Sequence, residues 1–227
     1  ASLFVFQRPA EPTHRLQVIL LVAILAAGTA LRLWDLGGPG LHGDEETMAM
    51  PTMHIVEHGT PLLPSGMFYP RAVVQLYLMA GSVALFGESE WAMRLPSVLC
   101  AVLLIWLGWR LGRRFLPPAR NLGFAAAIAF LPALIEEAQT ARMYVFLMAC
   151  GAGYAILLFE WERTGRLRHL IAAVLVLLFG MQFHTLAVFA AFLVMFPGLL
   201  HRDVRRLIQR GGAFVVLAGG FFAIDAW

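Results

Sequence analysis

The chain has 227 residues, of which 60% are hydrophobic and 14% charged, and its mean hydropathy is +0.75. These values exclude an ordinary soluble domain. All 17 basic side chains are arginine, the formal net charge is only +3, and both cysteines lie inside apolar runs, so neither nucleic-acid binding nor a disulfide framework is indicated.

Repeated apolar runs of transmembrane length predict an all-α polytopic membrane protein. The first run, 17–34, is too long and has flanks too polar for a cleaved signal peptide, so we expect a retained helix. The chain begins without methionine and ends near an apolar helix. We therefore expect residues 1–227 to form one transmembrane module, the N-terminal part of a longer protein.

Basic side chains gather in four short segments, which the positive-inside rule assigns to the cytoplasmic side together with the N-terminus. The segments are 8–15, 110–120, 162–169 and 201–210. An even number of membrane crossings must then separate each pair of neighbouring segments.

The first of these intervals holds three apolar stretches, 17–34, 72–87 and 94–109, so one of them cannot cross. Residues 72–87 form the shortest stretch, and we expect them to lie along the outer interface. Residues 35–93 then make a long outer loop that carries interfacial juxtamembrane helices.

Further helices follow in chain order. Residues 121–138 and 141–159 are expected to be two spans with a polar junction. The 32 residues 169–200 suit two short helices that turn near 181–184. A last helix starts near Gly212, which gives about seven transmembrane helices in all.

Three consecutive acids, Asp44, Glu45 and Glu46, follow the first apolar run. A structural interpretation makes Asp44 the N-cap of a helix and places the glutamates at the positive end of its dipole. A functional interpretation makes one carboxylate a general base, tuned by partial desolvation and by Arg71 or Arg94. Both interpretations stay open, although acids beside a membrane are functional candidates by default.

The expected topology gathers most of the acids that arginine does not flank on the outer face of the membrane. The polar candidates there are Asp44, Glu45, Glu46, Glu57, Glu88 and Glu90 in the first loop, Glu136, Glu137 and Arg142 at the second turn, and His184 at the third. A functional site is therefore expected on the outer, periplasmic face.

Four sequence segments follow one another along the chain in a characteristic order and spacing. They are LHGDEE after the first helix, LFGESEWAMRLPSVL (85–99), LGRRFL (111–116) and AQTARMYVFLMACGAGYAIL (138–157). Together they resemble the C-type glycosyltransferase superfamily, and most closely its bacterial branch of protein O-mannosyltransferases and lipid A aminoarabinose transferases. The resemblance extends over about residues 17–200 and is carried by the order and spacing of the segments.

The resemblance implies transfer of a sugar from a polyprenyl-phosphate carrier on the outer face of a bacterial inner membrane. It implies that Asp44, with Glu45 beside it, is the base or the positioning group for the acceptor. Glu137, slightly preferred over Glu136, would be the second acid. Arg142, with Tyr144 in the same ARMY element, would bind the donor phosphate or an acid of the site.

Two more residues are candidates for substrate binding. Relatives often carry a lysine before a proline in the first loop, near the carrier phosphate, whereas here Arg71 follows Pro70. His184 interrupts an apolar stretch and is either a polar turn or part of the site. His42, His54 and His58 share the first loop with the acids, so a divalent metal between carboxylates and imidazole is a candidate cofactor, and the resemblance allows one because some superfamily members use a metal. No His-Glu-x-x-His motif occurs, and histidines that bind lipid headgroups or backbone are the favoured alternative.

Two hypotheses from different classes remain. The first is a polyprenyl-phosphate-dependent glycosyltransferase that contacts its lipid donor and membrane lipids. The second is a non-catalytic membrane subunit that kept the fold and binds a partner complex or lipids, which the short chain and the missing lysine favour. A transporter fragment is disfavoured, because most predicted spans carry no charge in the middle.

Overall fold

The computed structural model describes residues 13–195 and isolated positions between 205 and 219. The predicted last helix, from near Gly212, lies mostly outside the described residues. The described part of the chain is helical, apart from loops and one isolated bridge between Leu62 and Phe68. The all-α class is therefore confirmed.

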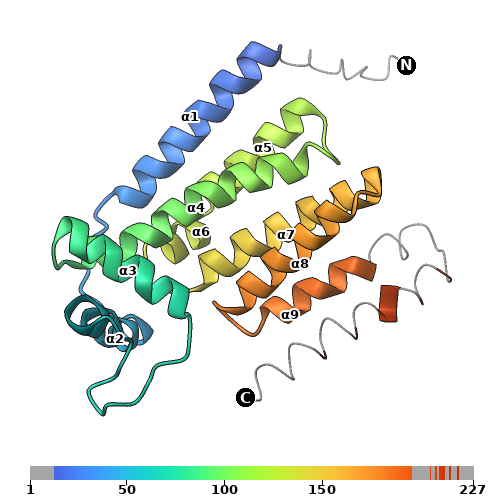
Figure 1. Cartoon of the computed structure of the whole chain (residues 1–227). Coiled ribbons are helices and arrows are strands. Elements are labelled where there is room, and N and C mark those ends of the chain that lie inside the picture. Colours follow the sequence, from blue (N-terminus) through green and yellow to red (C-terminus); the bar gives the residue numbers. More distant parts are fainter. Residues whose placement is uncertain are drawn as a thin grey trace, which may run out of the picture.

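Nine α-helices and one 3-10 helix are described. They are α1 (His14–Leu33), α2 (Asp44–His58), α3 (Val73–Phe86), α4 (Glu90–Gly112), α5 (Pro118–Phe130), α6 (Pro132–Ala138), α7 (Tyr144–Thr164), α8 (Leu167–Met181), α9 (Ala187–Ala190) and the 3-10 helix Ala191–Met195. Figure 1 shows α1, α4, α5, α7 and α8 running alongside one another, with α3 crossing their direction at one end and α2 beyond it.

Three of the described helices, α1, α4 and α7, are long and apolar enough to cross a membrane, and the bent pair α5–α6 makes a fourth if it counts as one span. The predicted number of about seven is therefore not confirmed. Helices α3 and α8 are apolar but have only 14 and 15 residues. At 1.5 Å per residue α3 measures about 21 Å, short of a hydrocarbon core of about 30 Å.

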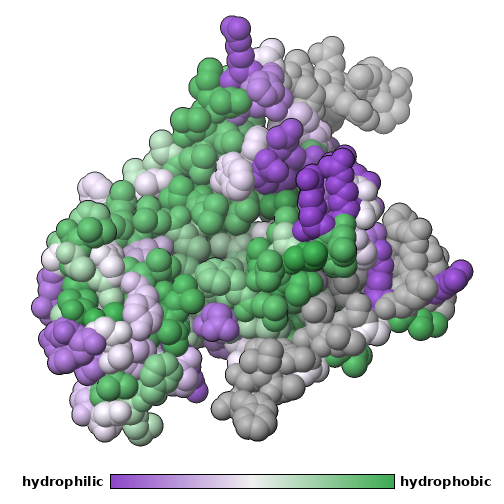
Figure 2. All heavy atoms as spheres, in the orientation of Figure 1, coloured by the Kyte–Doolittle hydropathy of each residue, from purple (hydrophilic) through white to green (hydrophobic). Residues whose placement is uncertain are grey.

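The surface agrees with a membrane location. Large apolar side chains are exposed along the helices, for example Ile19 at 62%, Leu99 at 62% and Ile171 at 51%. Figure 2 shows this hydrophobic surface over the middle of the bundle, with hydrophilic side chains gathered toward its ends. Water would oppose so large an apolar surface, whereas lipid chains cover it without cost.

The predicted span over 121–138 is bent, because α5 and α6 meet at an angle of 53°. Pro132 lacks an N–H, so the carbonyl of Ile128 loses its helical donor. The buried side chain of Arg32, on α1, replaces it. Its guanidinium donates to the carbonyl of Ile128 at 3.1 Å and to that of Ala129 at 2.7 Å.

Gln139, just after α6, also binds α1, but here the donor belongs to the α5–α6 side and the acceptors belong to α1. Its side-chain amide donates to the carbonyls of Leu31, Arg32 and Trp34, at 3.3, 3.4 and 2.8 Å. These carbonyls lie at the C-terminal end of α1, where no helical donor is available to them. The end of α1 and the turn after α6 are thus cross-linked, which fixes the position of the residues that follow Gln139.

Candidate functional site

A buried ion pair organises the end of the bundle where α2 lies. Glu45 and Arg94 are each 1% exposed, and the guanidinium grips the carboxylate through two bonds, Nε to Oε1 at 2.9 Å and Nη2 to Oε2 at 2.8 Å. The N–H of Ala141 donates to the same Oε1 at 2.7 Å. The remaining donors of Arg94 bind the carbonyls of Leu36, Pro39 and Gly40.

This pair joins α2, α4, the loop after α1 and the turn after α6. Burial by itself would raise the pKa of the Glu45 carboxyl. The hydrogen bonds from Arg94 and Ala141 and the charge of Arg94 outweigh the burial, so the pKa of Glu45 lies below its usual value. Both carboxylate oxygens are occupied by protein donors, which makes Glu45 a scaffold group in this structure.

Asp44 has different surroundings although it is the next residue. The N-cap of α2 is Gly43, at φ 59°, and no side chain caps the helix, so the N-cap interpretation of Asp44 is wrong. The Asp44 side chain is 66% exposed and forms an ion pair with Nη2 of Arg142. The acidic run therefore splits into one buried carboxylate and one accessible carboxylate.

Arg142 begins a row of contacts that leads away from Asp44. Its guanidinium carbon lies 5.0 Å from the ring centroid of Tyr144, within the range of a cation–π contact. The Tyr144 ring lies 5.9 Å from the imidazole of His184, with the two planes 33° apart. This row, Asp44–Arg142–Tyr144–His184, brings together four predicted site residues from α2, the start of α7 and the turn after α8.

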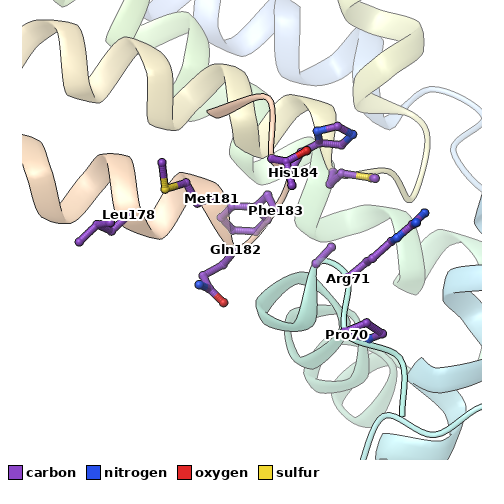
Figure 3. A pocket seen from close by; sticks show the side chains of 10 residues that line it. Pro70, Arg71, Leu178, Met181, Gln182, Phe183 and His184 are labelled. Atoms are coloured by element: carbon purple, nitrogen blue, oxygen red, sulfur yellow. The ribbon is translucent and has the colours of Figure 1, made fainter. Parts of the chain in front are cut away.

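The row ends at a pocket of about 530 Å³ between the start of α3 and the turn after α8. Arg71, Gln182, His184 and Thr185 supply its polar lining, and Figure 3 shows Arg71 on the loop before α3, across from the turn that carries Gln182, Phe183 and His184. Nδ1 of His184 accepts the Leu186 N–H at 3.0 Å. The neutral imidazole therefore carries its proton on Nε2, where it can be donated to an oxygen.

An apolar groove adjoins this pocket. It has a volume of about 750 Å³ and lies between α3, α4, α7 and α8, where leucine, phenylalanine and other apolar side chains line it almost throughout. Phe183 lines both the groove and the polar pocket. A ligand with a charged head and a long apolar tail would fit the two together.

A sequence model of the dolichyl-phosphate-mannose-protein mannosyltransferase family matches residues 70–227, more than half of the chain. The chain belongs to this family. It is accordingly a multi-pass membrane glycosyltransferase of the C type, and the predicted resemblance is confirmed. No curated protein matches the chain.

The matched residues of the mannosyltransferase family include Arg71, Arg142, Tyr144 and His184 but begin after Asp44. The ion pair between Asp44 and Arg142 therefore connects the unmatched acid to the matched part of the chain. The geometry thus adds a link that the family match alone does not contain.

Glu137, predicted as the second acid, lies on α6. Its Oε2 atom is buried and has no hydrogen-bond partner among the described residues. Glu136 is exposed. Among residues 13–195, no hydrogen bond or ion pair joins Glu137 to the row that starts at Asp44, so its catalytic role stays a prediction.

The candidate metal has no obvious set of ligands. In the described part of the chain, no group of three or more His, Cys, Asp or Glu side chains could hold a metal ion. Asp44 is paired with Arg142, and both oxygens of Glu45 are bound by Arg94 and Ala141. These residues therefore do not fit a metal ion.

Tyr69, two residues before Arg71, is a further residue near the site that the sequence does not indicate. Burial raises the pKa of the Tyr69 hydroxyl, the charge of Arg71 lowers it, and the charge of Asp44 raises it, with a net increase. The phenol thus lies within electrostatic reach of both Asp44 and Arg71. A tyrosine before a proline gives no signal in the sequence, because only the fold brings it close to Asp44.

Proposed function

We propose that this glycosyltransferase takes its sugar from a polyprenyl-phosphate donor and transfers it to an acceptor on the extracytoplasmic face of a bacterial inner membrane. One observation carries the proposal: the row Asp44–Arg142–Tyr144–His184 connects an accessible carboxylate to a cationic pocket that adjoins an apolar groove. An acid, a phosphate site and a lipid site are the three parts that this reaction needs.

The donor would occupy the pocket and the groove together. Its phosphate would accept hydrogen bonds from Arg71 and from Nε2–H of His184, which both line the polar pocket. Its prenyl chain would lie in the apolar groove, where it meets apolar side chains instead of polar groups. Phe183, which lines both spaces, would lie beside the first prenyl unit.

In the transfer step, an acceptor hydroxyl attacks the anomeric carbon of the sugar. The new bond joins the acceptor oxygen to that carbon, and the bond from the same carbon to the phosphate oxygen breaks. The proton of the acceptor passes to Asp44, and the electron pair leaves with the polyprenyl phosphate. Arg71 and His184 stabilise the charge that grows on the phosphate.

The ion pair between Asp44 and Arg142 determines the order in which donor and acceptor would be engaged. In the structure Asp44 is paired with Arg142, and a base so engaged is less available to an acceptor. A donor phosphate that attracts the Arg142 guanidinium would release Asp44. Donor binding would therefore precede activation of the acceptor. Glu45 takes a positioning role, since it holds Ala141, the neighbour of Arg142, in place.

Sugar transfer in membranes from radiolabelled polyprenyl-phosphate sugars tests the proposal. Asp44→Asn should lower the rate by about 10²- to 10⁴-fold, the usual contribution of a general base. Glu46→Gln is the matched control, because Glu46 is an exposed acid two residues away, and it should keep wild-type activity. Equal transfer by equally abundant wild type and Asp44→Asn would contradict the proposal and favour the non-catalytic subunit.

A further inference from the structure

A second cationic surface lies near the opposite end of α4 from the candidate site. Arg94 lies near the start of α4, and Arg110 and Arg113 lie at its far end. At 1.5 Å per residue, Arg110 is about 24 Å along the helix from Arg94. This surface is therefore separate from the pocket that holds Arg71 and His184.

The two arginines at this end stack on tryptophan rings. The guanidinium carbon of Arg110 lies 5.3 Å from the ring centroid of Trp106, and that of Arg113 lies 4.9 Å from the ring of Trp109. Stacking holds the plane of a guanidinium and leaves its N–H edge available to an oxygen ligand. The two guanidinium groups are therefore held in positions where they can donate hydrogen bonds to the anionic oxygens of a ligand.

The nearby acid, Glu160, forms ion pairs with other arginines. Glu160 accepts from both Arg114 and Arg163. Across the residues that the structure describes, no carboxylate pairs with Arg110 or Arg113. Their positive charge is therefore not balanced within this part of the chain, and an external anion can balance it.

The exposed face of α4 continues from these arginines as an apolar strip. Leu99, Leu103 and Trp106 are 62%, 47% and 38% exposed. With Arg110 they are spaced four, three and four residues apart, which places all four on one face of the helix. A strip of apolar side chains that ends in arginines matches a lipid chain that ends in a phosphate.

We propose that this face of α4 is a binding site for an anionic phospholipid. The phosphodiester would accept hydrogen bonds from Arg110 and Arg113, and an acyl chain would lie along Trp106, outside the groove proposed for the prenyl chain. The occupant is a membrane lipid and not free phosphate, because the apolar strip is continuous with the two arginines. Leu99 and Leu103 also line the groove proposed for the prenyl chain, whereas Trp106 and the two arginines lie outside it, so lipid binding at the arginine end is tested separately from glycosyl transfer.

Lipid binding to the purified full chain in mild detergent, followed by native mass spectrometry, tests this site. Phosphatidylglycerol should bind the wild type more tightly than phosphatidylcholine. Each arginine near an anionic lipid contributes about fivefold in affinity, so Arg110→Gln with Arg113→Gln should weaken phosphatidylglycerol about 25-fold and leave phosphatidylcholine unchanged. Arg110→Gln alone should give about fivefold, which keeps the test valid should the double variant fail to fold.

The matched control removes the same charge elsewhere. Arg166 and Arg168 are exposed and lie at the start of α8, so Arg166→Gln with Arg168→Gln should keep the preference for phosphatidylglycerol. An equal loss in the two double variants would overturn the site and indicate unspecific surface charge. Displacement of the lipid by inorganic phosphate at equal concentration would also overturn it, because the apolar strip would then contribute nothing.

Discussion

Asp44 and Glu45 are neighbours in the sequence, yet the fold gives them opposite surroundings. The Asp44 side chain is 66% exposed and meets a single partner, Arg142. The Glu45 side chain is 1% exposed and accepts hydrogen bonds from Arg94 and Ala141. The buried carboxylate holds four segments together, and the exposed one remains accessible to a substrate.

Under the proposed function, the run of acids serves both structure, through Glu45, and chemistry, through Asp44. A buried, doubly bonded pair is costly to break, because each partner alone would be an uncompensated buried charge. An exposed pair contributes little to stability and exchanges its partner easily. Rigidity next to a reactive group is what catalysis requires, since a base must be held in place but free to act.

Loss of Arg94 should have the largest effect on stability. Arg94→Met leaves Glu45 buried without its partner and removes the donors to three carbonyls. We expect the free energy of unfolding to fall by about 3–5 kcal/mol. Unfolding of the purified protein in detergent measures it, with Arg71→Met, an exposed arginine, as the control. A wild-type stability for Arg94→Met would show that the buried pair is not a scaffold.

Loss of Arg142 should affect the donor more than the fold. Arg142→Gln removes a charged hydrogen-bond donor, and we expect KM for the polyprenyl-phosphate sugar to rise about 10- to 100-fold, equivalent to about 1.5–3 kcal/mol. Its stability should change by less than about 1 kcal/mol, because the pair with Asp44 is exposed. An unchanged KM would show that Arg142 does not bind the donor phosphate.

Removal of the Tyr69 hydroxyl should have a smaller effect on transfer. Tyr69→Phe keeps the ring that packs against the core and deletes only the group near Asp44 and Arg71. We expect transfer to fall about 2- to 10-fold with unfolding unchanged, the size of one hydrogen bond that the hydroxyl would donate to the bound substrate. Initial rates at saturating donor measure it, and full activity would exclude the hydroxyl from the site.

The smallest expected effect is the pH dependence of stability, which should depend on Glu45. The lowered pKa of Glu45 means that its stabilising contribution is complete above the unfolded-state value of about 4.5. That contribution is lost as the pH falls below 4.5 through the lower, folded-state value. Thermal unfolding from pH 7 to pH 3 should give a higher Tm for wild type than for Glu45→Gln near neutral pH, and the two Tm values should converge at low pH. A constant separation would contradict the assignment.

Much of the fold follows from local sequence. The apolar runs predict the helices, and the polar residues near 181–184 predict the turn that α8 makes after Met181. The bend at Pro132 has a local cause, because proline lacks a helical donor, but the Arg32 side chain that binds the freed carbonyl of Ile128 is 96 residues away in the sequence. Helix periodicity contains no information about such a distant partner.

The candidate site was predictable as a set of residues but not as an arrangement. Asp44, Arg142, Tyr144 and His184 were singled out by type and position, and the structure brings them into one row. The scaffold role of Glu45 depends on Arg94, 49 residues later, and on the burial of both. Burial at that level is a property of packing, which a single sequence does not display.

We infer that Asp44 performs the chemistry while Glu45 supports it. The most direct test measures the initial rate of sugar transfer per folded molecule for Asp44→Asn and Glu45→Gln side by side. We predict that Asp44→Asn folds like wild type and transfers about 10²- to 10⁴-fold more slowly. Glu45→Gln should lose stability but keep most of its rate per folded molecule. A folded, inactive Glu45→Gln beside a fully active Asp44→Asn would contradict the account.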